Sequence, residues 1–162
     1  MNLDIHPQAL WDVPGGLRLA LPVWAALAGA AWADMRSGRV PGRLLLAGAG
    51  IAAVALLSSM PPLFLLGRLL PALLCGGLIW AVNEIWYRVR QQDALGMGDA
   101  QWSMLATLAF GMMPVLWAWA VAAWLGLAWM ALLRRRQRTI RRVFFTPFLL
   151  AGLVIVKMLL PQ

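Results

Sequence analysis

Two glycines and an aspartate stand together at the entrance to an apolar stretch, in the segment Asp93-Ala-Leu-Gly-Met-Gly-Asp99. Glycine has no Cβ, so its backbone can bend sharply or approach another chain closely. A turn with the pattern Gly96-x-Gly98-Asp99 can therefore bring a carboxylate against the peptide bond of a substrate. We interpret Asp99 as a candidate catalytic residue, with Gly96, Gly98 and Asp93 as residues that support the site.

A second aspartate, Asp34, directly follows the first long apolar stretch. Peptide hydrolysis by carboxylates needs a neutral acid that polarises the carbonyl and a carboxylate that deprotonates water. Two carboxyls held close together cannot both ionise easily, so such a pair shares a proton. We therefore predict Asp34 and Asp99 as a catalytic acid/base pair. The helix dipole favours an anion at the start of a helix, where Asp99 stands, and disfavours it at the end, so we expect Asp34 to hold the shared proton.

Both aspartates also have ordinary structural interpretations. Asp99 is suited to cap the N-terminus of its helix, a common role for aspartate. Asp34 stands at a helix end where the dipole opposes a negative charge, and pairing with Arg36 or Arg39 would compensate for it.

The composition is that of an integral membrane protein. Hydrophobic residues make up 62% of the chain and charged residues 12%, against about 45–50% and about 25% in an ordinary soluble domain. The charges form short clusters between long apolar runs, which is typical of a helical bundle and not of an outer-membrane barrel. We expect an all-α, polytopic transmembrane bundle in which residues 1–162 form a single domain.

No cofactor is expected. The single cysteine, Cys75, lies in an apolar run, and the single histidine, His6, has no second ligand spaced to join it at a metal ion. The net charge of +8 is interpreted as a record of topology and contact with anionic lipid, and not as a nucleic-acid-binding surface.

Six apolar stretches are predicted as membrane spans. The fourth is short because residues 111–114 interrupt it: its 13 or so residues, at about 1.5 Å each, cover about 20 Å of a hydrocarbon layer about 30 Å thick. Asp99 is therefore expected below the lipid headgroups, in a water-filled recess, a costly position that marks function. The predicted spans are residues 17–33, 44–59, 63–86, 101–113, 115–133 and 143–160.

The basic residues predict the orientation. Most Lys and Arg residues fall in the connections between spans one and two, three and four, and five and six. Because cytoplasmic loops carry an excess of Lys and Arg, we expect these connections in the cytoplasm and both chain termini outside. Asp34 and Asp99 then face the same, cytoplasmic, side. The basic residues of these connections are Arg36, Arg39, Arg43, Arg88, Arg90, Arg134, Arg135, Arg136, Arg138, Arg141 and Arg142.

Three stretches resemble motifs of the type IV prepilin peptidases, membrane aspartic proteases grouped with the preflagellin peptidases. Asp34-Met-Arg-Ser-Gly-Arg-Val-Pro41 resembles the first motif of that family, an Asp followed by a hydrophobe and Pro. Residues 93–99 resemble its Glu-Ala-Met-Gly-x-Gly-Asp motif, and Phe145-Thr-Pro-Phe-Leu149 resembles a Pro-Phe-Leu element that opens the last span.

This resemblance implies Asp34 and Asp99 as the catalytic pair, with Arg36 and Pro41 of the first motif as supporting residues. It implies a prepilin-like substrate with a short basic leader and an apolar helix, cut after a Gly on the cytoplasmic side of the bacterial inner membrane. The chain lacks the cysteine-bearing insert and methyltransferase region of larger members. We therefore expect peptidase activity without N-methylation, as in the short members that serve Flp (Tad) pili or conjugative systems.

Two positions depart from the family pattern and keep an alternative open. Gly42 stands where Asn or Asp is usual, and Gln101 stands where Lys is common. Both favour a non-catalytic assembly or scaffold protein of a pilus or secretion system, a degenerate peptidase. Two further classes are an intramembrane protease of the signal-peptide peptidase type, whose first aspartate lies in mid-helix, and a small transporter, which would need a polar midplane site or an inverted repeat.

Overall fold

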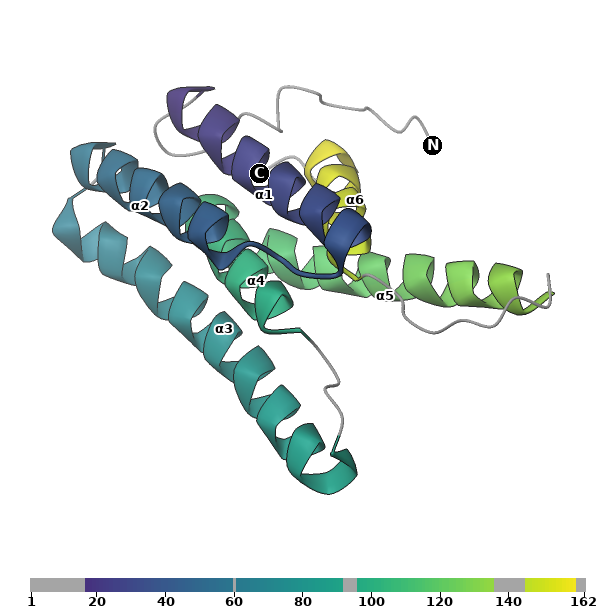
Figure 1. Ribbon diagram of the computed structural model, residues 1–162. Coiled ribbons are helices and arrows are strands. Elements are labelled where there is room, and N and C mark those ends of the chain that lie inside the picture. Colours follow the sequence, from purple (N-terminus) through teal and green to yellow (C-terminus); the bar gives the residue numbers. More distant parts are fainter. Residues whose placement is uncertain (1–16, 60, 92–95, 136–144, 160–162) are drawn as a thin grey trace.

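Six helices make up the computed structural model, which describes residues 17–59, 61–91, 96–135 and 145–159 (Figure 1). Each helix forms at one of the predicted apolar spans, and no strand occurs in these residues, so the all-α prediction is confirmed. The helices are α1 (Leu17–Ser37), α2 (Gly42–Ser59), α3 (Pro62–Arg90), α4 (Met97–Phe110), α5 (Met112–Arg135) and α6 (Thr146–Leu159).

Several helix ends differ from the prediction by a few residues, and two of these differences bear on the aspartates. α1 continues to Ser37, because the first residue that stops it is Gly38, whose φ of 63° is left-handed and whose N–H donates to the carbonyl oxygen of Asp34 at 2.8 Å. Asp34 therefore lies in the last turn of α1 and not in the connection that follows. α4 begins at Met97, so Asp99 lies in its first turn.

The predicted interruption after span four is confirmed. Gly111 separates α4 from α5 with a φ of 88°, a conformation that favours glycine. Its N–H donates to the carbonyl oxygen of Thr107 at 2.9 Å, and Pro114 falls in the first turn of α5. α4 is therefore a short helix of 14 residues.

The short helix α4 is the centre of the bundle, because it packs against all five other helices (Figure 1). The Trp102 side chain is fully buried, and its indole N–H donates to the carbonyl oxygen of Leu27 on α1 at 3.3 Å. α5 and α6 pack closely where a Cβ built on Gly152 would lie 2.5 Å from the carbonyl oxygen of Ala118. Enclosure of α4 by its neighbours buries Asp99 and Ala100 in its first turn, whereas Met97 is exposed.

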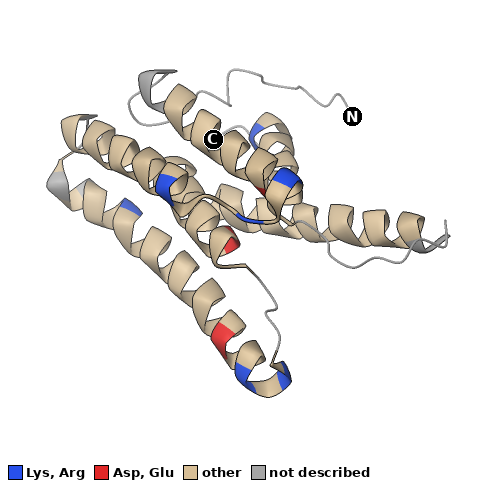
Figure 2. Cartoon of the chain, in the orientation of Figure 1, with Lys and Arg blue, Asp and Glu red and all other residues tan. Residues whose placement is uncertain are grey.

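Apolar side chains cover the outside of the molecule. Leu63, Val89 and Trp124 are each more than 70% exposed, whereas soluble monomers rarely expose large contiguous apolar patches. Charged residues are few along the helices (Figure 2). Within the described chain, two helices are long and apolar enough to cross a membrane, Leu65–Arg90 and Met112–Leu133, and two shorter apolar helices are Gly42–Ser58 and Thr146–Leu159. These helices suggest a membrane protein; six spans with both termini outside stay a prediction.

Candidate active site

Asp34 and Asp99 line the same pocket, which has a volume of about 350 Å³. Three parts of the chain form it: the end of α1 with the connection after it, the start of α4, and the start of α6. Asp34 is 8% exposed and Asp99 7% exposed, so both carboxylates are buried. The lining residues are Asp34, Gly38, Arg39, Val40, Gly96, Met97, Gly98, Asp99 and Thr146.

Both oxygens of the Asp99 carboxylate accept hydrogen bonds. The backbone N–H of Gly96 donates to Oδ2 at 3.2 Å, and the hydroxyl of Thr146 donates to Oδ1 at 2.9 Å. Gly96 is the N-cap residue of α4, and Asp99 is the third residue of the helix. Asp99 therefore caps its own helix from within the first turn, and the interpretation of Asp99 as the N-cap residue itself is wrong in position.

Gly98 brings the start of α4 against the connection that follows α1. A Cβ built on Gly98 would collide with the Cβ and Cγ2 atoms of Val40, so only glycine allows this approach. Gly96 differs, since a Cβ there would meet its nearest atom, Oδ2 of Asp99, at an ordinary 3.5 Å. Of the two glycines, Gly98 is therefore the one that the packing requires. This packing places the start of α4, with Asp99, beside the connection that follows the last turn of α1, where Asp34 lies.

Asp34 does not pair with either neighbouring arginine. No ion pair between Asp34 and Arg36 or Arg39 is formed in the described part of the chain, whereas Glu84 and Arg88 on α3 do form one, at 2.9 Å between Oε1 and Nε. Arg36 is exposed and does not line the pocket, whereas Arg39 does. The pairing with Arg36 or Arg39 that offered Asp34 an ordinary structural role is therefore not formed.

Burial raises the pKa of Asp99 above its ordinary value of 3.8. The hydrogen bonds from Thr146 and Gly96 lower it, and the charge of Asp34 raises it, but the loss of water around the carboxyl is the largest effect. Asp99 lies in the first turn of α4, before the predicted fourth membrane span, residues 101–113. The helix dipole predicts Asp34 as the holder of a shared proton, whereas burial favours the neutral form of the Asp99 carboxyl.

Other residues singled out in the sequence lie around the pocket or outside the described residues. The carbonyl oxygen of Pro41 accepts from the N–H groups of Leu44 and Leu45, at 3.0 and 3.4 Å, and so starts α2 beside the site. Asp93 lies outside the described residues.

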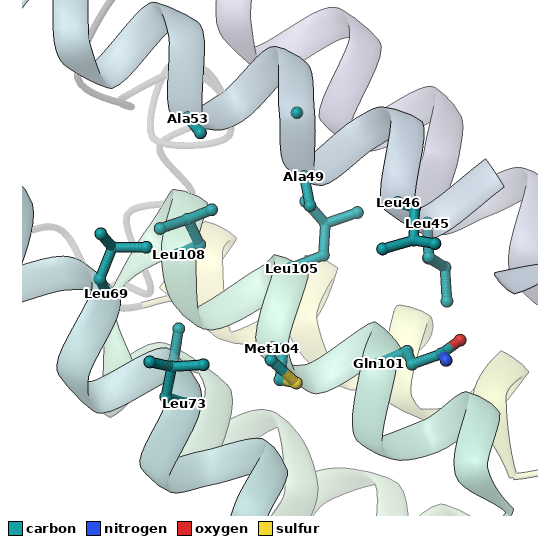
Figure 3. A pocket seen from close by; sticks show the side chains of 12 residues that line it. Leu45, Leu46, Ala49, Ala53, Leu69, Leu73, Gln101, Met104, Leu105 and Leu108 are labelled. Carbon is teal, nitrogen blue, oxygen red and sulfur yellow. The ribbon is translucent and has the colours of Figure 1, made fainter. Parts of the chain in front are cut away.

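The two departures from the family pattern lie against each other. A Cβ built on Gly42 would be 3.0 Å from the side-chain Oε1 of Gln101. Gln101 is also the polar residue of a groove of about 370 Å³ between α2, α3 and α4, otherwise lined by apolar residues such as Leu73 and Met104 (Figure 3). The Gln101 side chain occupies space that a larger residue at position 42 would need.

Thr146 is a site residue that the sequence did not identify. Its side chain is 1% exposed and contacts Asp99 directly. The stretch Phe145-Thr-Pro-Phe-Leu149 was singled out, but nothing in its pattern indicates that the threonine faces an aspartate 47 positions earlier. No group of three His, Cys, Asp or Glu side chains that could hold a metal ion occurs among the residues that the structure describes.

One of three comparisons with known proteins gives a match, and that match covers most of the chain. No curated protein and no solved structure gives a significant match. The sequence model of the type IV leader peptidase family matches residues 19–133, a stretch that contains both Asp34 and Asp99 and ends before α6. The chain therefore belongs to the type IV leader peptidase family.

Proposed function

We propose that this protein is an aspartic endopeptidase of the bacterial inner membrane that removes the short basic leader of a prepilin-like protein. Asp34 and Asp99 are its catalytic pair. The observation that carries the proposal is the convergence of these two buried carboxyls on one pocket from separate helices. The family match supports peptidase chemistry on a prepilin-like substrate.

The surroundings of the two carboxyls suggest a division of labour. Burial favours a neutral Asp99, which can donate a hydrogen bond to the oxygen of the scissile carbonyl. The Asp34 carboxylate takes a proton from water as the water oxygen bonds to the carbonyl carbon, and Asp99 passes its proton to the carbonyl oxygen. The tetrahedral intermediate then breaks its C–N bond, the leaving nitrogen takes a proton from Asp34, and Asp99 recovers its own proton from the new carboxyl. The cycle needs only the two carboxyls and one water molecule.

The arrangement of the helix ends supports a cytoplasmic active site. The end of α1, the start of α4 and the start of α6 meet at the pocket. The Arg-rich connections predicted to be cytoplasmic include those that follow α1 and precede α4 and α6. Under the positive-inside rule, the pocket then opens toward the cytoplasm, where a basic leader is presented.

Leader removal from a candidate prepilin tests the proposal. The prepilin is expressed with the wild-type protein, Asp34→Asn or Asp99→Asn, and cleavage is followed by the mass of the product. We expect each substitution to lower the cleavage rate about a thousandfold or more. Glu84→Gln is the matched control, because it neutralises a carboxylate on α3 that is paired with Arg88 and lies away from the pocket lining.

The outcomes separate the alternatives. Cleavage by the wild-type protein and by Glu84→Gln, but not by either aspartate variant, supports the pair. Cleavage that survives both aspartate substitutions rejects it. A non-catalytic scaffold would leave the prepilin uncut by the wild-type protein as well.

A further inference from the structure

Thr146 contacts Asp99 from a helix that lies outside the stretch matched by the family. Its hydroxyl donates to Oδ1 of Asp99 at 2.9 Å, and its side chain is 1% exposed. Both partners are therefore shielded from bulk water. In such buried surroundings a hydrogen bond to a carboxyl group is strong, and its loss is costly.

Trp119 links the start of α6 to α4. Its indole N–H donates to the hydroxyl oxygen of Ser103 on α4 at 2.9 Å. Its ring packs against the ring of Phe145, the residue before Thr146, with 5.1 Å between centroids. The carbonyl oxygen of Phe145 accepts from the N–H groups of Phe148 and Leu149, which fixes the first turn of α6. Thr146 is therefore held in place independently of its bond to Asp99.

The two donors to Asp99 differ in what they can do. The backbone N–H of Gly96 can only donate, so Oδ2 is suited to remain an acceptor throughout. A hydroxyl can donate to a carboxylate and, after rotation about its C–O bond, accept from a carboxylic acid when no substrate is bound. When the acid proton is directed at the scissile carbonyl of a bound substrate, the hydroxyl can donate to the remaining lone pair of Oδ1. Thr146 can therefore stay bonded to Asp99 whether the carboxyl is ionised or protonated, which a backbone amide in its place could not.

We propose that Thr146 is a positioning residue for Asp99: its hydroxyl fixes the orientation of the carboxyl group and remains bonded to it in both protonation states. This inference rests on the proposed function, in which Asp99 carries and returns a proton. It assigns to α6 a direct part in the site.

Few other charges surround this contact. Among the described residues, the charged side chains that line the pocket besides Asp99 are Asp34, from α1, and Arg39, from the following connection. From α6, the pocket lining includes Thr146, which is uncharged. Lys157, also on α6, has its Nζ atom 5.7 Å from the ring centroid of Phe110, at the opposite end of α4 from Asp99.

The test compares Thr146→Val, which keeps the shape and removes the hydroxyl, with Thr146→Ser, which keeps the hydroxyl. Thr107→Val is the matched control, because Thr107 is a fully buried threonine of α4 whose hydroxyl has no hydrogen-bond partner. Each full-length variant is examined in two ways: the pH dependence of prepilin cleavage, and the titration of Asp99 followed by the ¹³C resonance of its labelled carboxyl carbon.

Loss of the hydroxyl removes a bond that favours the ionised form, so the Asp99 titration in Thr146→Val should move to higher pH by about one unit. The alkaline limb of the cleavage profile should move in the same direction, and the maximal rate should fall about tenfold. Thr146→Ser should restore the midpoint and bring the rate to within about threefold of wild type. Thr107→Val should change neither.

The inference is overturned if the Asp99 midpoint in Thr146→Val matches that of Thr107→Val, whatever the cleavage rates are. It is also overturned if Thr146→Ser behaves like Thr146→Val, because a hydroxyl then does not matter. Two other results contradict the proposed function and not this inference: a wild-type protein that cuts no prepilin, and an Asp99→Asn variant that stays active. In either case the titration still decides whether Thr146 controls the Asp99 carboxyl.

Discussion

Gly98 lies so close to Val40 that no side chain fits between them. The contact joins the first turn of α4 to the connection that follows α1. Asp99 lies in that first turn, and Asp34 lies in the last turn of α1. The glycine in this position is therefore a packing requirement of the site and not only a flexible link.

Gly98→Ala should disrupt the pocket. Overpacking of this kind costs about 1–3 kcal/mol, more than the roughly 1 kcal/mol that alanine gains over glycine in a helix. We expect a lower free energy of unfolding in detergent and a cleavage rate reduced about tenfold or more. Gly96→Ala is the matched control, since its Cβ meets only ordinary contacts, and it should cost less than about 1 kcal/mol. Equal effects of the two substitutions would argue against the close approach at Gly98.

Gly42 and Gln101 should be energetically coupled. An asparagine at position 42 would displace the Gln101 amide, whose Oε1 already lies 3.0 Å from the position of a Cβ on Gly42. We expect Gly42→Asn to destabilise the protein when Gln101 is present and to be tolerated better with Gln101→Ala, with a coupling energy of about 1 kcal/mol. Chemical denaturation of the two single variants and the double variant measures it. Simple additivity of the two effects would show that the side chains do not compete for space.

The stability of the protein should depend on the ionisation of Asp99. The pKa of Asp99 is raised in the folded state above the 3.8 of an ordinary aspartate, so its contribution to stability is complete below about pH 4 and is lost as the pH rises through the folded-state pKa. Asp99→Asn cannot ionise. The free energy of unfolding of this variant, relative to wild type, should therefore increase as the pH is raised from about 4, and then level off. Denaturation curves over a pH series test this, and a constant or falling difference would contradict it.

The helices could be predicted from the sequence because their apolar runs are long and their interruptions are marked by charge, glycine or proline. The break at Gly111 was found for this reason. The end of α1 was misplaced because Asp34 and Arg36 look like the start of a loop, whereas the helix continues until Gly38 provides a left-handed residue. Polarity alone does not end a helix.

The aspartates could be predicted, but the third contributor to the pocket could not. Asp34 and Asp99 are scarce acids in an apolar chain, at helix ends expected on one side of the membrane. Thr146 carries no such signal, because a threonine at the start of an apolar helix is unremarkable until the packing of α6 against α5 and α4 is known. The raised pKa of Asp99 could not be predicted either, since burial of this carboxyl depends on the surrounding helices.

The most direct test of the catalytic pair is the rate of leader removal by Asp34→Asn, Asp99→Asn and the double variant, measured against wild type with the same prepilin. Residues that act as one unit are strongly non-additive. We predict that each single substitution lowers the rate as much as the double substitution does, to within about threefold. Rate losses that multiply, or a single variant that keeps the wild-type rate, would contradict the shared role of Asp34 and Asp99.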